Sequence, residues 1–184
     1  VLTLPEVLVV DDDVLVREHT AKREFAWVRG LPPDERSVHY HHKPSIVFLI
    51  GPQETGKAHI AQTLEERLVR EGFAAYYLGL SNALGGISDD SAAALENRDE
   101  HLHRLGELSR IMYDAGMIFI ATVSDMEDYE MKILGDICSP ARPIIVSTGG
   151  AADGGIADLT LAHNESVNDA ADKIIELLRK RGVI

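Results

Sequence analysis

Through most of the chain, short apolar runs alternate with longer stretches whose apolar residues recur every three or four positions. Residues 46–50 are continuously apolar, as expected for a strand that is buried on both faces. The following stretch carries Ile60, Leu64 and Leu68 at helical spacing and ends at Gly72. Such alternation of strand and helix predicts an α/β fold with a mostly parallel sheet.

The remaining elements continue this alternation. A long amphipathic helix is predicted over residues 96–115, and the last helix begins near Ser166, where Ser166 and Asp169 resemble a capping box. One side of the long helix carries Leu102, Leu105, Leu108 and Met112. Further strands are predicted over residues 74–80, 117–123, 143–147 and 158–162.

The first 44 residues follow a different pattern, which we interpret as a small N-terminal extension and a connector. Apolar residues 7–10 and 14–16 flank three aspartates, which predicts two short strands around an acidic turn. Residues 30–44 hold three prolines and a charged stretch with His39, His41 and His42, which we interpret as a solvated connector. The predicted organisation is an extension over 1–44 and one α/β domain over 45–184.

Composition narrows the classes of function. The length of 184 residues and a hydrophobic content of 45% fit one globular domain with a core. A net charge of -12 argues against a nucleic-acid partner, because such binding depends on Lys and Arg neutralising phosphates. The single cysteine, Cys138, excludes an intrachain disulfide framework. With no signal-peptide pattern and no apolar stretch near the ~20 residues that cross a bilayer, we expect a soluble, cytoplasmic protein without a membrane partner.

The strongest chemical signal is a phosphate loop between the first buried strand and the first helix. Main-chain N–H groups of such a loop, together with the helix N-terminus, attract phosphate oxygens. Its two glycines permit backbone conformations that cost other residues energy, and its lysine reaches the outer phosphates. The loop predicts a three-layer P-loop nucleotide-kinase fold, and the alternative is a plain strand–turn–helix connection. The candidate nucleotide contacts are Gly51, Gln53, Glu54, Thr55, Gly56, Lys57 and Ala58.

Ala58 departs from the usual phosphate-loop pattern. A Ser or Thr normally follows the lysine, because its hydroxyl ligates the nucleotide's magnesium. Alanine has no oxygen to offer, and Thr55 is a poor substitute three residues earlier. We therefore expect ATP or ADP as the ligand, with magnesium more weakly positioned. Phosphoryl transfer depends on positioning and charge neutralisation, so binding survives this change more easily than catalysis.

A set of short segments accompanies the phosphate loop in a characteristic order and spacing: residues 63–68, 71–73, 77–78, 96–98, 104–107, 114–118 and 130–131. Through these segments, from residue 45 to about 131, and again at the last helix, the sequence resembles adenylylsulfate kinase. Residues 38–40 are similar to the short arm that leads into the kinase domain of that family. The family uses ATP to phosphorylate the 3′-hydroxyl of adenosine 5′-phosphosulfate (APS), giving PAPS.

The resemblance implies a substrate side that includes Asn82, Arg98, His101 and Ser124. Arg98 stands where the family contacts APS, and His101 stands where the family has asparagine. Residues 79–86 replace a segment that carries two carboxylates and a substrate-binding arginine in the family, and they retain only the asparagine and the last glycine. Residues 148–155 are small and nearly uncharged where the family has a basic lid. Without a lid, exclusion of water during transfer is poor.

These departures favour an adenylylsulfate-kinase-like domain of sulfate activation that binds an adenine nucleotide, with weak or lost kinase activity and a regulatory or scaffolding role. The alternatives are an active kinase that makes PAPS and a structural dimerisation module without ligand. We expect APS or PAPS as a further ligand, a homodimer, and fusion to or association with a sulfurylase. We assign no catalytic residue and no metal site.

Overall fold

Five parallel strands form one sheet in the computed structural model, which describes residues 30–52, 54–79, 92–124, 126–149 and 156–184. Residues Leu31–Ile184 form one unit of the chain, and the account below is confined to it. The two short strands predicted over residues 7–16 lie outside the described residues, as do Gln53 and Asn82.

The strands lie in the order β2-β3-β1-β4-β5. β1 (Ser45–Gly51) is central and pairs with β3 (Ile118–Ser124) on one side and with β4 (Ile144–Ser147) on the other. β2 (Ala75–Leu78) pairs with β3, and β5 (Leu159–Thr160) pairs with β4. The bounds of the five strands agree with the sequence predictions to within two residues, and each described strand pair is parallel, so the predicted parallel sheet is confirmed.

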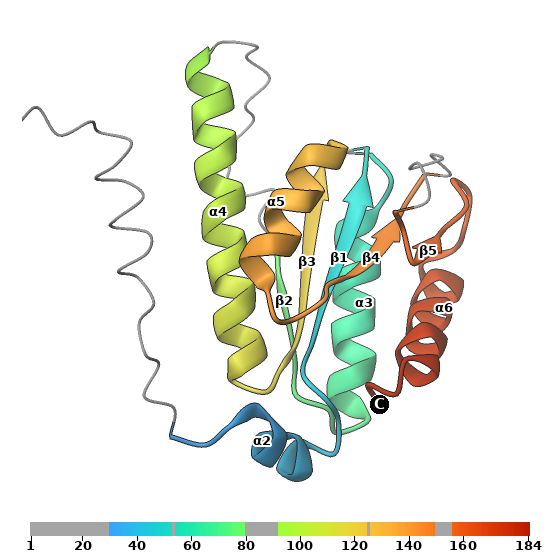
Figure 1. Cartoon of the computed structure of the whole chain (residues 1–184). Coiled ribbons are helices and arrows are strands. Elements are labelled where there is room, and N and C mark those ends of the chain that lie inside the picture. Colours follow the sequence, from blue (N-terminus) through green and yellow to red (C-terminus); the bar gives the residue numbers. More distant parts are fainter. Residues whose placement is uncertain (1–29, 53, 80–91, 125, 150–155) are drawn as a thin grey trace, which may run out of the picture. The chain divides into compact units, whose positions relative to one another are not determined.

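Helices cover both faces of the sheet, which gives the predicted three layers (Figure 1). α3 (Lys57–Arg70) and α6 (Val167–Lys180) pack on one face, where Val47 and Leu49 of β1 are fully buried. α4 (Ala92–Asp114) and α5 (Asp128–Cys138) pack on the other face, against Phe48 of β1. Since successive strand residues point to opposite faces, a strand covered on both sides must be continuously apolar, as residues 46–50 are.

Two helices arise where the hydrophobic pattern predicted none. α2 (Pro33–Tyr40) lies within the stretch that we interpreted as a connector. It has a proline in its first turn followed by Asp34 and Glu35, which suits the positive end of a helix. None of its residues is buried, so it leaves no periodic apolar signal.

α5 begins with a capping box between the side chains and main-chain N–H groups of Glu127 and Glu130. It buries Met131, Leu134 and Cys138 against the sheet. Because the helix is short and its first turn is acidic, its apolar residues give only a weak periodic pattern in the sequence.

The interpretation of all three histidines of the connector as solvated is wrong for His42, which is only 4% exposed. Its Nδ1 lies 3.0 Å from the carbonyl of Lys43, and its Nε2 accepts a hydrogen bond from the main-chain N–H of Ala74 at 3.1 Å. Nδ1 must therefore donate, which is the pattern of the neutral ring. Its ring stacks on Tyr40 and meets the edge of Phe73. His42 thus joins the end of α2 to the strand that starts near Ala74.

These contacts predict a dependence of stability on pH. Burial lowers the pKa of His42 below 6.5, and the weaker effect of its hydrogen bond to Lys43 does not offset this. The unfolded chain therefore takes up the proton first as the pH falls. Stability from neutral His42 is fully present above pH 6.5 and is lost as the pH falls through the folded-state pKa.

Urea unfolding between roughly pH 7.5 and pH 5 tests this within the range where histidines titrate. We expect His42→Gln to flatten the fall in the free energy of unfolding, because an amide does not take up the proton. His41→Gln is the matched control, since His41 is exposed and should leave the fall unchanged. Equal pH dependence in the wild type and in His42→Gln would contradict the assignment.

Candidate functional site

The phosphate loop leaves the carboxyl end of the central strand and enters the first turn of α3. Gly51 is the last residue of β1, Gly56 is the N-cap of α3, and Lys57 is its first residue. Ligands of open parallel sheets bind at this edge, beyond the carboxyl ends of the strands. The structure thus places the loop in the strand–turn–helix context that a phosphate site requires.

Lys57 folds back into the curve of its own loop. The residue is 4% exposed, and its Nζ donates hydrogen bonds to the carbonyls of Gly51, at 2.7 Å, and of Pro52. Thr55 Oγ1 lies 3.4 Å from the same nitrogen. These contacts hold the ammonium group inside the curve of the loop, at the end of the site where phosphate oxygens would lie.

A chain of hydroxyl groups ties the loop to the neighbouring strand. Thr55 Oγ1 lies 2.7 Å from Thr148 Oγ1, and Thr148 donates to the carbonyl of Ile50 through its hydroxyl at 3.0 Å and through its main-chain N–H at 2.8 Å. The end of β4 is therefore fastened to the exit of β1. Sequence reasoning missed Thr148 as part of the loop's support, and its place directly after a buried strand was the available signal.

The positions at which a metal ion would be held are poor in oxygen donors. Ala58 lies in the first turn of α3 and offers only a methyl group. The hydroxyl of Thr55 is engaged with Thr148 and with the carbonyl of Pro52 at 2.9 Å. In the part of the chain that the structure describes, no three His, Cys, Asp or Glu residues come together as a metal site. A divalent ion bound here would depend on the nucleotide and on water for its ligands.

The structure brings together two of the predicted substrate-side residues, Arg98 of α4 and Ser124 at the end of β3. Arg98 Nη2 donates to the main-chain carbonyl of Ser124 at 3.2 Å, so the contact uses the backbone of Ser124. His101 lies one turn further along α4 and is partly buried. Within the described residues no hydrogen bond joins it to Arg98 or Ser124.

Glu130 of α5 pairs with Arg98, and sequence reasoning did not assign it a role. The guanidinium meets both carboxylate oxygens: Nε contacts Oε1, and Nη2 lies 3.0 Å from Oε2. Glu130 is 1% exposed and also accepts the N–H of Glu127 at 2.8 Å. Burial acts to raise the pKa of Glu130, but the hydrogen bonds from Arg98 and Glu127 and the charge of Arg98 together lower it. Glu130 therefore stays ionised and neutralises Arg98.

The family model described as adenylylsulphate kinase matches residues 43–132 of this chain. The match includes the phosphate loop, Arg98, Ser124 and Glu130. This chain therefore contains a domain of the adenylylsulphate kinase family.

Curated relatives agree with this assignment. An adenylyl-sulfate kinase of Vibrio parahaemolyticus is 27% identical over 132 residues, which cover 72% of this chain and 60% of the relative. An adenylyl-sulfate kinase of Klebsiella pneumoniae is 33% identical over 112 residues, which cover 61% of this chain and 56% of the relative. The chain thus spans about half the length of the curated relatives it matches.

Solved structures show that the adenylylsulphate-kinase-like domain has the fold of this family. The APS kinase of Mycobacterium tuberculosis in complex with AMPPNP and APS superposes with a TM-score of 0.62 at 18% identity, covering 75% of this chain and 99% of that chain. A hexameric APS kinase from Thiobacillus denitrificans superposes with a TM-score of 0.63 at 14% identity, covering 96% of this chain and 38% of that chain. Among the described helices, none is both long and apolar enough to cross a bilayer.

The two loop glycines predict different costs of substitution. Gly51 has φ +134, and a Cβ built on it would lie 2.4 Å from the carbonyl oxygen of Thr148. Gly56 has φ +73, and a Cβ built on it meets nothing within 4 Å. We expect Gly56→Ala to destabilise by about 1 kcal/mol, the cost of a left-handed backbone. Gly51→Ala should cost about 3 kcal/mol or more, because strain and the clash with β4 add.

Urea unfolding of the two variants measures this difference. Both variants replace a glycine of the same loop by alanine, but only Gly51 lies against Thr148. Equal destabilisation would mean that the contact between β4 and the exit of β1 does not constrain the loop.

Proposed function

We propose that this domain binds an adenine nucleotide through its phosphate loop and serves sulfate activation with weak or lost phosphoryl transfer. The observation that carries the proposal is the charge of Lys57 inside the loop, held there by the carbonyls of Gly51 and Pro52. The ligands we propose are ATP or ADP at the loop and APS or PAPS on the side of Arg98. Support comes from the family match and from the M. tuberculosis structure, whose protein is an APS kinase with AMPPNP and APS bound.

Two features of the described residues support loss of transfer rather than loss of binding. Ala58 withholds the hydroxyl that would position magnesium, and phosphoryl transfer depends on that ion more than binding does. The buried carboxylate of Glu130 neutralises Arg98. Arg98 therefore attracts a substrate anion less than an arginine whose guanidinium has no carboxylate partner would. The substrate end of the site is thus largely compensated by Glu130.

An active kinase is the second candidate, and the contact between Arg98 and Ser124 favours it. The two residues that the resemblance assigns to APS lie together at the same sheet edge as the loop. In that case Lys57 would contact the ATP phosphates and Arg98 the APS substrate.

The proposal extends to assembly and location. The T. denitrificans enzyme is hexameric, which supports self-association of this domain, and we propose a homodimer as its smallest form. We also propose that it acts in the cytoplasm, where ATP is supplied, fused to or associated with a sulfurylase.

Thermal unfolding with a panel of ATP, ADP, APS and PAPS tests nucleotide binding. A ligand at a hundredfold excess over its Kd should stabilise the protein by ~2.7 kcal/mol. Lys57→Ala should abolish the shift, because it removes the charge inside the loop. Lys180→Ala, an exposed lysine at the end of α6, is the matched control and should keep it. An unchanged shift in Lys57→Ala would remove the loop from the site, and no shift with any ligand would favour the structural module.

A coupled assay for PAPS formation tests the loss of transfer, with the K. pneumoniae relative as the reference. We expect turnover at least ~100-fold below that reference, since the metal and substrate contacts are both weakened. Ala58→Ser should raise nucleotide affinity in the presence of magnesium about threefold, as one further ligand contact would. The same variant measured in EDTA is the control and should match the wild type. Wild-type turnover equal to the reference would establish the active kinase instead.

A further inference from the structure

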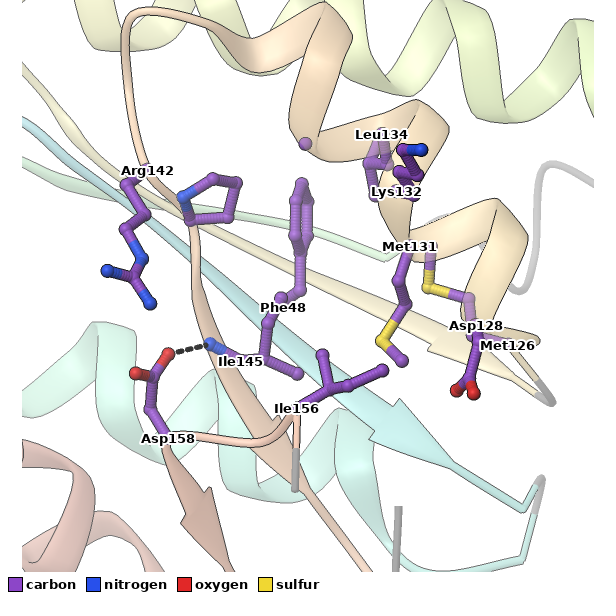
Figure 2. A pocket seen from close by; sticks show the side chains of 12 residues that line it. Phe48, Met126, Asp128, Met131, Lys132, Leu134, Arg142, Ile145, Ile156 and Asp158 are labelled. Atoms are coloured by element: carbon purple, nitrogen blue, oxygen red, sulfur yellow. Dashed lines mark hydrogen bonds between the residues drawn. The ribbon is translucent and has the colours of Figure 1, made fainter. Parts of the chain in front are cut away.

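A hollow lies away from the phosphate loop, on the face of the sheet that α5 covers (Figure 2). Its volume is about 240 Å³, and its walls come from β1, α5, β4 and the segment before β5. None of the residues that line it belongs to the phosphate loop, and Arg98, Ser124 and Glu130 do not line it. The site described above therefore leaves this hollow without a role.

The walls of the hollow are mainly apolar. An apolar cavity of about 150 Å³ is known to hold one benzene, so about 240 Å³ is enough for a body of one or two rings. Two of the apolar residues are methionines, which adapt their shape and contact aromatic rings favourably. In Figure 2 the apolar side chains come from both sides of the hollow; they are Phe48, Met126, Met131, Leu134, Ile145 and Ile156.

Two cations, Lys132 and Arg142, stand among the lining residues. Within the described part of the chain, neither side chain has a hydrogen-bond or ion-pair partner. The lining carboxylate of Asp158 is already occupied, because it accepts the N–H of Ile145 at 2.9 Å and pairs with Arg181. Asp128, the other lining carboxylate, is exposed in the first turn of α5, where the helix dipole favours it. Within the described residues, Lys132 and Arg142 thus leave hydrogen-bond donors available beside an apolar hollow.

We propose that this hollow binds a small aromatic anion, with one or two rings and a carboxylate, sulfonate or sulfate group. The rings lie against Met126 and Ile156, two lining residues whose side chains are not fully buried, and burial of apolar surface there drives binding. The anionic group lies at the rim beside Arg142, whose guanidinium supplies hydrogen bonds and charge, and Lys132 adds positive charge from α5 on the other side (Figure 2). This site is separate from the nucleotide site and does not depend on kinase activity.

Isothermal titration with 2-naphthalenesulfonate tests the proposal, with 2-naphthalenemethanol as an uncharged probe of the same ring system. We expect saturable binding of the sulfonate, at least about threefold tighter than the alcohol, as exposed charge pairs typically provide. Arg142→Gln and Lys132→Gln should each weaken the sulfonate about threefold and leave the alcohol unchanged. No saturable binding up to about 1 mM sulfonate, or equal affinity for the two probes, would overturn the proposal.

Gly135 gives a direct way to fill the hollow. It lines the hollow within α5, and a Cβ built on it meets nothing within 4 Å, so a longer side chain can extend into the space. Gly135→Leu should weaken both probes at least tenfold, while Gly135→Ala is the matched control and should bind nearly as the wild type does. If Gly135→Leu does not fold, Ile156→Trp at the exposed rim provides the same blockade. Undiminished binding in a folded blocked variant would overturn the site, and displacement of the sulfonate by ADP would overturn its separation from the nucleotide site.

Discussion

The parallel pairing of β1 with β3 and β4 is the constraint on which the rest of the structure depends. It sets Gly51 beside Ser124, and Ile50 beside Ser147, at one edge of the sheet. Because both faces of β1 are buried, a shift of one residue would turn Phe48 and its neighbours toward the wrong helices. The loop lysine, the carbonyl that holds Arg98 and the hydroxyl of Thr148 therefore lie at the same edge of the sheet because three strands end together. No contact among these residues would arise without that register.

Two positive charges lie at this edge, and the protein treats them differently. The carbonyl groups of Gly51 and Pro52 hold the ammonium of Lys57 inside the phosphate loop. The carboxylate of Glu130 cancels the charge of Arg98 and is itself too deeply buried to turn toward solvent. Removing one partner of a buried ion pair leaves the other uncompensated, so this pairing is costly to break. The attraction for anions at the Arg98 end of the site is therefore weakened by the buried carboxylate of Glu130.

Sequence patterns predicted the elements whose apolar residues are regularly spaced, such as β1 and the buried side of α3. They did not predict α2, which buries nothing, or the short α5. The phosphate loop was predictable because all its parts are adjacent in the chain. The pairing of Arg98 with Glu130 was not, because it joins two helices whose relative position follows only from packing on the sheet. The burial of His42 was not predictable for a similar reason, since its partner Ala74 lies far away in sequence. Functional groups that are adjacent in the chain could thus be predicted from the sequence, whereas contacts between helices and strands could be found only in the structure.

The residues that keep this fold are largely different from those that would carry its chemistry. On α3, Ile60, Leu64 and Leu68 point into the core, whereas Ala58 lies in the first turn beside the loop. An alanine there, in place of the hydroxyl residue usual in phosphate loops, leaves no buried polar group without a partner, so it costs little stability. A chain can therefore superpose on APS kinases with TM-scores of 0.62 and 0.63 while its ligand-facing residues change. Similarity of the backbone between two such domains reflects the residues of their cores. Their binding and catalytic properties depend on the side chains at the edge of the sheet.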